Sequence, residues 1–127
     1  MLTKAMTTTM LPVSDMNRAA RFYGDTLGLH LRTTATDGSR VFDAGNGDAI
    51  GLLQSEAGAQ SQRTVLTFEV TDIRGEIRDL ERRGVTFADY DLPDLRTVGH
   101  VAEMGNEKAA WFSDPEGNIL CIHEVTG

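Results

Sequence analysis

A short sequence pattern occurs twice in this chain, and the repetition constrains the fold more than any other feature. Val13-Ser14-Asp15-Met16 returns fifty-seven residues later as Val70-Thr71-Asp72-Ile73. After each copy, apolar residues follow at the spacing of an amphipathic helix, at Met16, Ala20, Tyr23 and Leu27 and then at Ile73, Ile77 and Leu80. Each helix is predicted to begin after an aspartate, Asp15 or Asp72, whose carboxylate can accept hydrogen bonds from free backbone N–H groups. A strand that leads into a capped helix is therefore the repeated unit.

The remainder of each unit is predicted to form strands. In the first unit the helix ends at Gly28, and the strands 29–36, 40–44 and 49–54 are separated by Asp37-Gly38 and Asn46-Gly47, which favour hairpins. In the second unit the helix ends at Gly84, and the β-compatible runs are 85–88, 98–103, 108–113 and 118–125. The last two are joined by Asp114-Pro115-Glu116-Gly117, a sequence typical of a type I turn. The predicted order is β-α-β-β-β, twice.

Chain length limits how these units are organised. A chain of 127 residues can bury one core but not two independent ones, so residues 1–127 are predicted to form a single domain. The first module covers about 5–54 and the second about 64–127, and the small, polar segment 55–63 is interpreted as a linker.

Charge and cysteine content exclude several classes of partner. The net charge of −7, without a basic stripe, argues against nucleic acid or anionic lipid as a partner. Cys121 is the only cysteine and cannot form an internal disulfide, and no long apolar segment resembles a signal peptide or a membrane span. We therefore expect a cytoplasmic protein.

Residues 10–23 (MLPVSDMNRAARFY), 27–29 (LGL) and 110–119 (AWFSDPEGNI) together resemble the vicinal oxygen chelate superfamily. Its members include glyoxalase I, extradiol dioxygenases, and bleomycin and fosfomycin resistance proteins. The resemblance implies an α+β fold with two βαβββ modules in tandem, whose curled mixed sheets surround a ligand cleft. It also implies a homodimer.

The resemblance further implies where a metal ion would bind. Metal-dependent members carry a His, Gln or Glu on each of four strands that face the cleft. Counted from the motifs, these positions are Thr8, Gly51, Val65 and Cys121 in this chain. A lone cysteine beside Thr, Gly and Val supplies too few donors to displace the hydration shell of a divalent ion. We therefore expect no metal and no other cofactor.

Side chains alternate between the two faces of a strand, and this predicts the lining of the cleft. The predicted lining consists of Thr8, Met10, Gly51, Leu53, Val65, Thr67, Glu69, Trp111, Cys121 and His123. The alternate residues Leu66, Phe68 and Val70 are expected to pack under a helix. The sequence leaves open whether Trp111 or Phe112 faces the cleft. Cys121 is interpreted as a buried small apolar residue, and His123 either as a surface residue or as the partner of Glu69.

Three functions are compatible with these features. The favoured hypothesis is a metal-free protein that binds a small molecule, such as an antibiotic or a hydrophobic metabolite, without catalysis. The alternative is a glyoxalase-like or dioxygenase-like enzyme with lyase or isomerase chemistry, which uses non-standard metal ligands or acid–base groups, with Glu69, Cys121 and His123 as candidates. The third is a structural or regulatory dimer with a vestigial cleft. The sequence does not assign a catalytic residue for any of the three.

Overall fold

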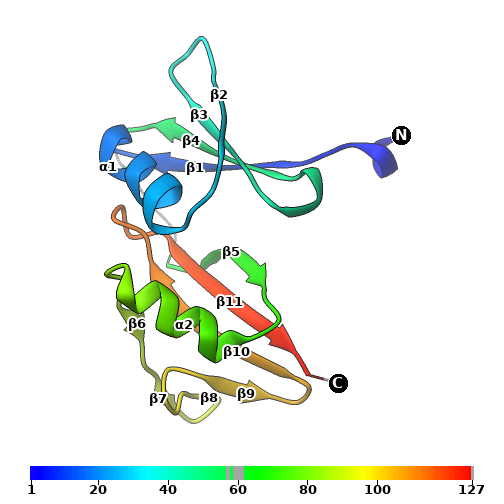
Figure 1. Cartoon of the computed structure of the whole chain (residues 1–127), viewed down its shortest axis with the longest axis vertical. Coiled ribbons are helices and arrows are strands. Elements are labelled where there is room, and N and C mark those ends of the chain that lie inside the picture. The colour runs from blue at the N-terminus through cyan, green and yellow to red at the C-terminus, as the bar shows by residue number, and fades with distance from the viewer. Residues whose placement is uncertain (57, 59–61, 127) are drawn as a thin grey trace. The chain divides into compact units, whose positions relative to one another are not determined.

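The computed structural model describes residues 1–56, 58 and 62–126, and it has a mixed α+β fold. The chain forms two compact units (Figure 1). Unit 1 comprises Met1–Gln60 with Pro115–Gly117, and unit 2 comprises Ser61–Asp114 with Asn118–Gly127. Part of the predicted linker 55–63, at positions 57 and 59–61, lies outside the described residues, as does position 127 of the second module.

Unit 1 contains a four-stranded sheet in the order β1-β4-β3-β2. Its elements are η1 (Leu2–Lys4), β1 (Thr8–Val13), α1 (Met16–Arg21), η2 (Phe22–Thr26), β2 (Leu31–Thr34), β3 (Arg40–Asp43), η3 (Gly45–Gly47) and β4 (Ala49–Gln54). β1 and β4 are parallel, whereas β3 is antiparallel to both of its neighbours. Leu11 and Val13 of β1 are buried with Ala19 and Tyr23 of the helical segment, so the core of this unit lies on the α1 side of the sheet.

Unit 2 repeats the arrangement of one helix against one sheet (Figure 1). Its elements are β5 (Thr64–Glu69), α2 (Ile73–Arg82), β6 (Phe87–Ala88), β7 (Asp91–Leu92), β8 (Leu95–Arg96), β9 (Ala102–Met104), β10 (Glu107–Ser113) and β11 (Ile119–Val125). The main sheet has the order β5-β11-β10-β6, and β9 also pairs with β10. The buried side of this sheet carries Leu120, Ile122 and Phe112, and α2 buries Ile73, Ile77 and Leu80.

Both predicted helix starts are confirmed. The carboxylate of Asp15 accepts a hydrogen bond from the backbone N–H of Arg18, and that of Asp72 from Gly75, each at 3.1 Å. A glutamate distant in sequence adds to each cap. Glu116 accepts from the backbone N–H groups of Ser14 and Asp15 at 2.6 and 3.0 Å. Glu124 accepts from the backbone N–H of Ile73 at 2.9 Å. The free donors at each helix start are therefore satisfied partly by tertiary contacts.

The first helix differs from its prediction as one continuous α-helix. It changes at Phe22 into a π-helical turn, in which Leu27 N–H donates to Phe22 O at 2.9 Å. Gly24 lies in this turn, where an added Cβ would approach Phe42 to 3.4 Å. Gly28, with φ of 76°, ends the segment as predicted, and Gly84, with φ of 94°, ends α2.

One strand prediction in unit 2 is corrected, and one pair of strands was not predicted. The predicted strand 98–103 is broken, because Gly99 and His100 adopt positive φ angles of 58° and 71°, and β9 begins only at Ala102. The polar stretch before it contains a two-stranded ribbon, β7–β8, which the sequence analysis missed. Leu66, Phe68 and Val70 are half-buried. The deep core of unit 2 comes instead from β10, β11 and α2.

Within the described part of the chain, no helix is both long and apolar enough to cross a membrane.

Candidate functional site

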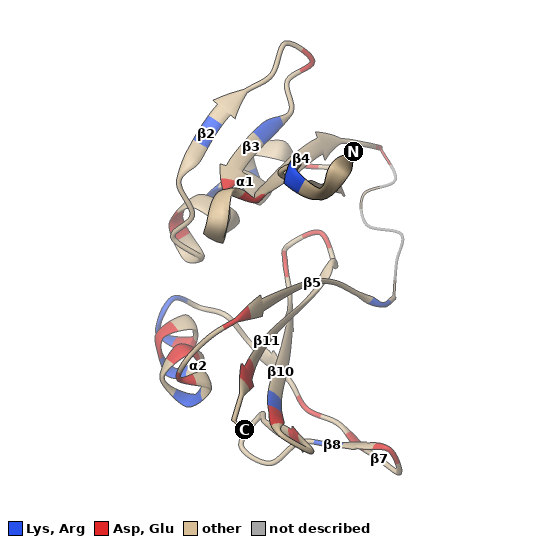
Figure 2. Ribbon diagram, turned by 90° about the vertical axis from the view of Figure 1, so that its right-hand side faces the viewer, with Lys and Arg blue, Asp and Glu red and all other residues tan. Residues whose placement is uncertain are grey.

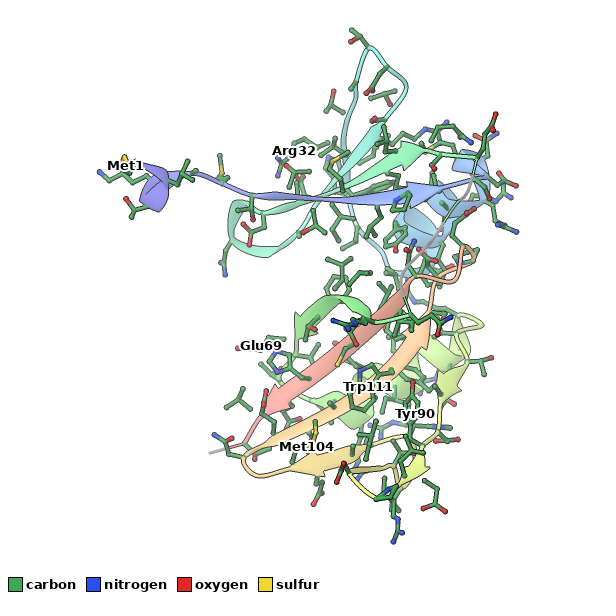
Figure 3. The ribbon with its side chains drawn as sticks, turned by 180° about the vertical axis from the view of Figure 1, so that it is seen from behind. Met1, Arg32, Glu69, Tyr90, Met104 and Trp111 are labelled. Atoms are coloured by element: carbon green, nitrogen blue, oxygen red, sulfur yellow. The ribbon has the colours of Figure 1, made fainter. Side chains whose placement is uncertain are left out.

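Among the described residues of unit 2, α2 is the one helix and lies on one face of the sheet, so the other face carries none. Six of the predicted cleft residues belong to the strands of this sheet. Figure 3 views the sheet from the side opposite to α2 and shows Glu69, Trp111, Tyr90 and Met104 on this side. Strand register aligns Cys121 with Thr67 on one neighbour and with Trp111 on the other, and His123 with Glu69. A register shift near Ile119 and Leu120 leaves Val65 outside this alignment. We call this surface the helix-free face of unit 2: Thr67, Glu69, Ala88, Met104, Glu107, Ala109, Trp111, Cys121 and His123.

The structure decides between Trp111 and Phe112. Phe112 is 2% exposed and packs against Phe87, with ring centroids 5.3 Å apart. Trp111 lies on the opposite face, where it is half-buried. Tyr90 meets Trp111 edge to face, with centroids 5.6 Å apart and ring planes at 90°. Trp111 is therefore the aromatic side chain that this strand presents on the helix-free face.

His123 lies between two carboxylates. Its Nδ1 is 2.9 Å from Glu107 Oε1, and its Nε2 is 4.0 Å from Glu69 Oε1. The imidazole is 21% exposed, whereas the carboxylate side chains of Glu69 and Glu107 are 73% and 45% exposed. The sequence left open whether His123 is a surface residue or the partner of Glu69. The structure shows a His–carboxylate pair, in which the shorter contact of His123 is to Glu107 and the longer one is to Glu69. This arrangement presents carboxylate oxygens to a ligand.

In unit 1, the four predicted cleft residues lie on β1 and β4. Thr8 and Met10 are exposed, and the register pairs Met10 with Gly51 and Pro12 with Leu53. Met10 covers Gly51 closely, because a Cβ built on Gly51 would lie 2.5 Å from the Met10 sulfur and 3.4 Å from the Thr8 methyl. Met10 would have to move before a metal-binding side chain could occupy position 51.

Cys121 is a buried thiol, as predicted. It is 5% exposed and donates to the carbonyl of Ile122 at 3.4 Å. Burial raises the pKa of Cys121 to about 11, although hydrogen bonds at Ala110 and Thr67 act in the opposite direction. The thiolate required for nucleophilic attack or metal binding is therefore scarce at neutral pH.

We expect the Cys121 thiol to resist alkylation in the native protein. A pKa of about 11, compared with 9.0 for an unperturbed thiol, reduces the thiolate fraction at pH 8 about hundredfold. Iodoacetamide labelling followed by mass spectrometry should therefore be at least about hundredfold slower in the native protein than in the urea-unfolded chain. Equal rates would show that this thiol is accessible and ionised.

The donor set does not fit the metal ion that the fold family implies. Thr8 offers a hydroxyl, Gly51 and Val65 offer no side-chain donor, and Cys121 is a protonated thiol. Among residues 1–56, 58 and 62–126, no three His, Cys, Asp or Glu side chains gather as a group able to hold a metal ion.

Two residues of this region were not predicted from the sequence. Glu107 shares strand parity with Trp111, but the predicted strand began one residue later, at Lys108. Tyr90 precedes the unpredicted ribbon β7–β8 and borders a hollow of about 490 Å³, which is lined by Asp89, Tyr90, Asp91, Arg96 and Thr97. Period-two alternation could have identified Glu107, whereas nothing local in the sequence indicates the contact between Tyr90 and Trp111.

The chain thus forms two units, each with one helical segment against a mixed sheet. The model of the glyoxalase/bleomycin resistance protein/dioxygenase superfamily matches residues 5–122, and the chain belongs to this family, which is the vicinal oxygen chelate superfamily. A comparison with curated proteins returned no match.

Solved structures support the fold. A putative glyoxalase family protein from Bacillus anthracis is 20% identical, with a TM-score of 0.76 over 96% of this chain and 95% of that one. TnmS3, an antibiotic-binding protein from Streptomyces sp. CB03234, is 22% identical, with a TM-score of 0.71 over 98% of both chains. An integron cassette protein from the mobile metagenome of V. Cholerae is 25% identical, with a TM-score of 0.66 over 98% and 97%.

Proposed function

We propose that this protein binds a small organic molecule without a metal ion and sequesters it, the ligand being an antibiotic or another hydrophobic metabolite. The observation that carries the proposal is the composition of the helix-free face of unit 2. It presents the ring of Trp111, while the family's metal position on the same face is a buried, protonated thiol. Aromatic and apolar surface with a few polar groups is typical of small-molecule sites.

Several features support binding rather than metal-dependent catalysis. Thr8 and Gly51, the corresponding positions of unit 1, lack strong metal donors, and Met10 covers Gly51. TnmS3 has this fold and is an antibiotic-binding protein, so the fold is compatible with such a role. We further propose that the protein acts in the cytoplasm as a homodimer. Exposed apolar side chains such as Leu31, Leu53 and Leu92, which lie outside the helix-free face, are suited to burial against a second copy.

A second candidate function is catalysis by acid–base groups. The short contact between His123 and Glu107 favours it, because a histidine oriented by a carboxylate can transfer a proton. Cys121 is a weak candidate for such chemistry because of its raised pKa.

Metal analysis and thermal unfolding together test the proposed function. After dialysis, the protein is expected to hold no stoichiometric divalent metal, and added nickel, zinc, manganese or iron should leave Tm unchanged. By contrast, an organic ligand at about one hundred times its Kd should stabilise the fold by about 2.7 kcal/mol, because it binds only the native state. For a domain of this size, this corresponds to a rise in Tm of about 10 °C.

Two results would contradict the proposal. The first is about one metal ion per chain by elemental analysis, with loss of metal in the Glu69→Ala and His123→Ala variants, which would favour the enzyme. The second is an antibiotic and metabolite panel in which no compound raises Tm. The Trp111→Leu variant tests whether the ligand binds at the proposed site. It should keep the fold but lose the ligand-induced rise in Tm.

A further inference from the structure

We infer that the ligand is a planar aromatic cation that lies on Trp111 and directs its positive charge toward Glu69 and Glu107. This inference rests on the proposed function and names the ligand class for the same helix-free face of unit 2. It follows from the side chains around Trp111, the charges on the face and the spacing between the two.

The strand neighbours of Trp111 are small residues. Its direct cross-strand neighbours are Cys121 and Ala88, and Ala109 precedes it by two residues on the same strand face. These side chains are small, so they do not obstruct a planar molecule that lies against the indole. The perpendicular contact with Tyr90 restrains the indole ring, which reduces the entropy lost on binding. A rigid aromatic ring beside small residues favours stacking with another aromatic ring.

The charge on this face is negative. Of all the residues in β5, β6, β9, β10 and β11, only Lys108 is a lysine or arginine, and it lies on the opposite face because it neighbours Ala109 on the same strand. Figure 2 shows acidic segments on β5 and β10, which correspond to Glu69 and Glu107. Glu69 and Glu107 flank His123 and are accessible to solvent. An organic cation would be attracted both by these carboxylates and by the electron-rich face of Trp111.

The spacing sets the shape of the ligand. His123 lies two residues beyond Cys121 on β11, and Cys121 is the register partner of Trp111. Two residues of strand span about 7 Å, which is comparable to the length of two or three fused rings. A fused aromatic system on Trp111 can therefore bring a charged group at its end near Glu69 and Glu107.

The hollow beside Tyr90 extends the acidic surface. It is lined by Asp89 and Asp91. The hollow also contains Arg96, whose guanidinium pairs with Asp91 at 3.0 Å. Glu69 and Glu107 lie on the same strand face as Trp111, and this face carries no lysine or arginine of the strands. We therefore assign the recognition of charge to Glu69 and Glu107 rather than to this hollow.

Calorimetric titration of the full chain with three probes tests the inference. The probes are 9-aminoacridine, a planar cation at pH 7; anthracene-9-carboxylate, a planar anion of similar shape; and cyclohexylammonium, a cation without an aromatic plane. We expect 9-aminoacridine to bind at least about tenfold more tightly than either other probe. Its Kd should increase between 0.05 and 0.5 M NaCl, because salt screens exposed charges.

Variants separate the two parts of recognition. The double variant Glu69→Gln/Glu107→Gln should remove most of the preference for the cation over the anion. Trp111→Leu should weaken both planar probes. Glu103→Gln is the matched control, because Glu103 is an exposed carboxylate of β9 that pairs with Lys108 on the opposite face. It should leave all three affinities unchanged.

Other outcomes of the titrations would contradict the inference. If both planar probes bind with equal affinity, or if the double variant keeps the preference, the inference is wrong, whereas binding at Trp111 and the proposed function stand. If no probe binds, the inference is wrong as well, and the broader ligand panel then decides the proposed function. Circular dichroism of each variant excludes loss of fold as the cause.

Discussion

Replacing Phe112 with alanine is expected to lower the free energy of unfolding by about 3–5 kcal/mol. Phe112 is 2% exposed and packs against Phe87 with centroids 5.3 Å apart. Its cross-strand neighbours are Phe87 on β6 and Leu120 on β11. Truncation would remove apolar contacts with both neighbouring strands, β6 and β11, and leave a cavity. Urea-induced unfolding would measure the loss of stability.

Trp111→Ala is the matched control, because it changes the adjacent residue on the opposite face. Trp111 is only half-buried, so its truncation should cost about 1–2 kcal/mol. It should nevertheless abolish ligand binding if the proposed site is correct. A loss above about 3 kcal/mol for Trp111→Ala, with a loss below about 1 kcal/mol for Phe112→Ala, would mean that the two faces of β10 are assigned in reverse.

Replacing Glu116 with glutamine is expected to destabilise the protein by about 2–3 kcal/mol at pH 7. The Glu116 side chain is 2% exposed and accepts hydrogen bonds from Ser14 N–H, Ser14 Oγ, Asp15 N–H and Arg18. Burial alone would raise the pKa of this carboxyl, but the hydrogen bonds from Ser14, Arg18 and Asp15 outweigh it and lower the pKa to about 2. Glutamine lacks the charge, and its amide would place a donor against another donor.

The lowered pKa also sets the pH dependence of this effect. A carboxyl with a pKa of about 2 in the folded state and 4.5 in the unfolded state contributes fully above pH 4.5. This contribution is lost as the pH falls from 4.5 toward 2. Urea-induced unfolding of both proteins at pH 7, 4 and 2.5 should therefore show a stability difference that shrinks with acidity. Glu103→Gln should show no such trend, and a pH-independent difference for Glu116→Gln would contradict the assigned interactions.

Local patterns were sufficient to predict the elements that depend on neighbouring residues. Asp15 and Asp72 cap their helices because the carboxylate reaches a backbone N–H three residues later, which requires no distant partner. Gly28 and Gly84 end the helices because they adopt positive φ. The motifs around Asp15 and Asp114 were sufficient to identify the family, which the family model confirms.

Tertiary structure decided the features that depend on pairing between distant residues. Strand alternation alone predicts that Trp111 and Phe112 point to opposite faces of the sheet. Which of the two faces the core is determined only by the packing of β10 with β6 and β11. Likewise, Glu116 reaches Ser14 across 102 residues, and no local pattern encodes that contact. Glu107 meets His123 because β10 and β11 pair in one register. The sequence by itself therefore determined helix boundaries and family, since short-range hydrogen bonds and motifs specify them, whereas long-range strand register and burial decided the arrangement of the candidate site.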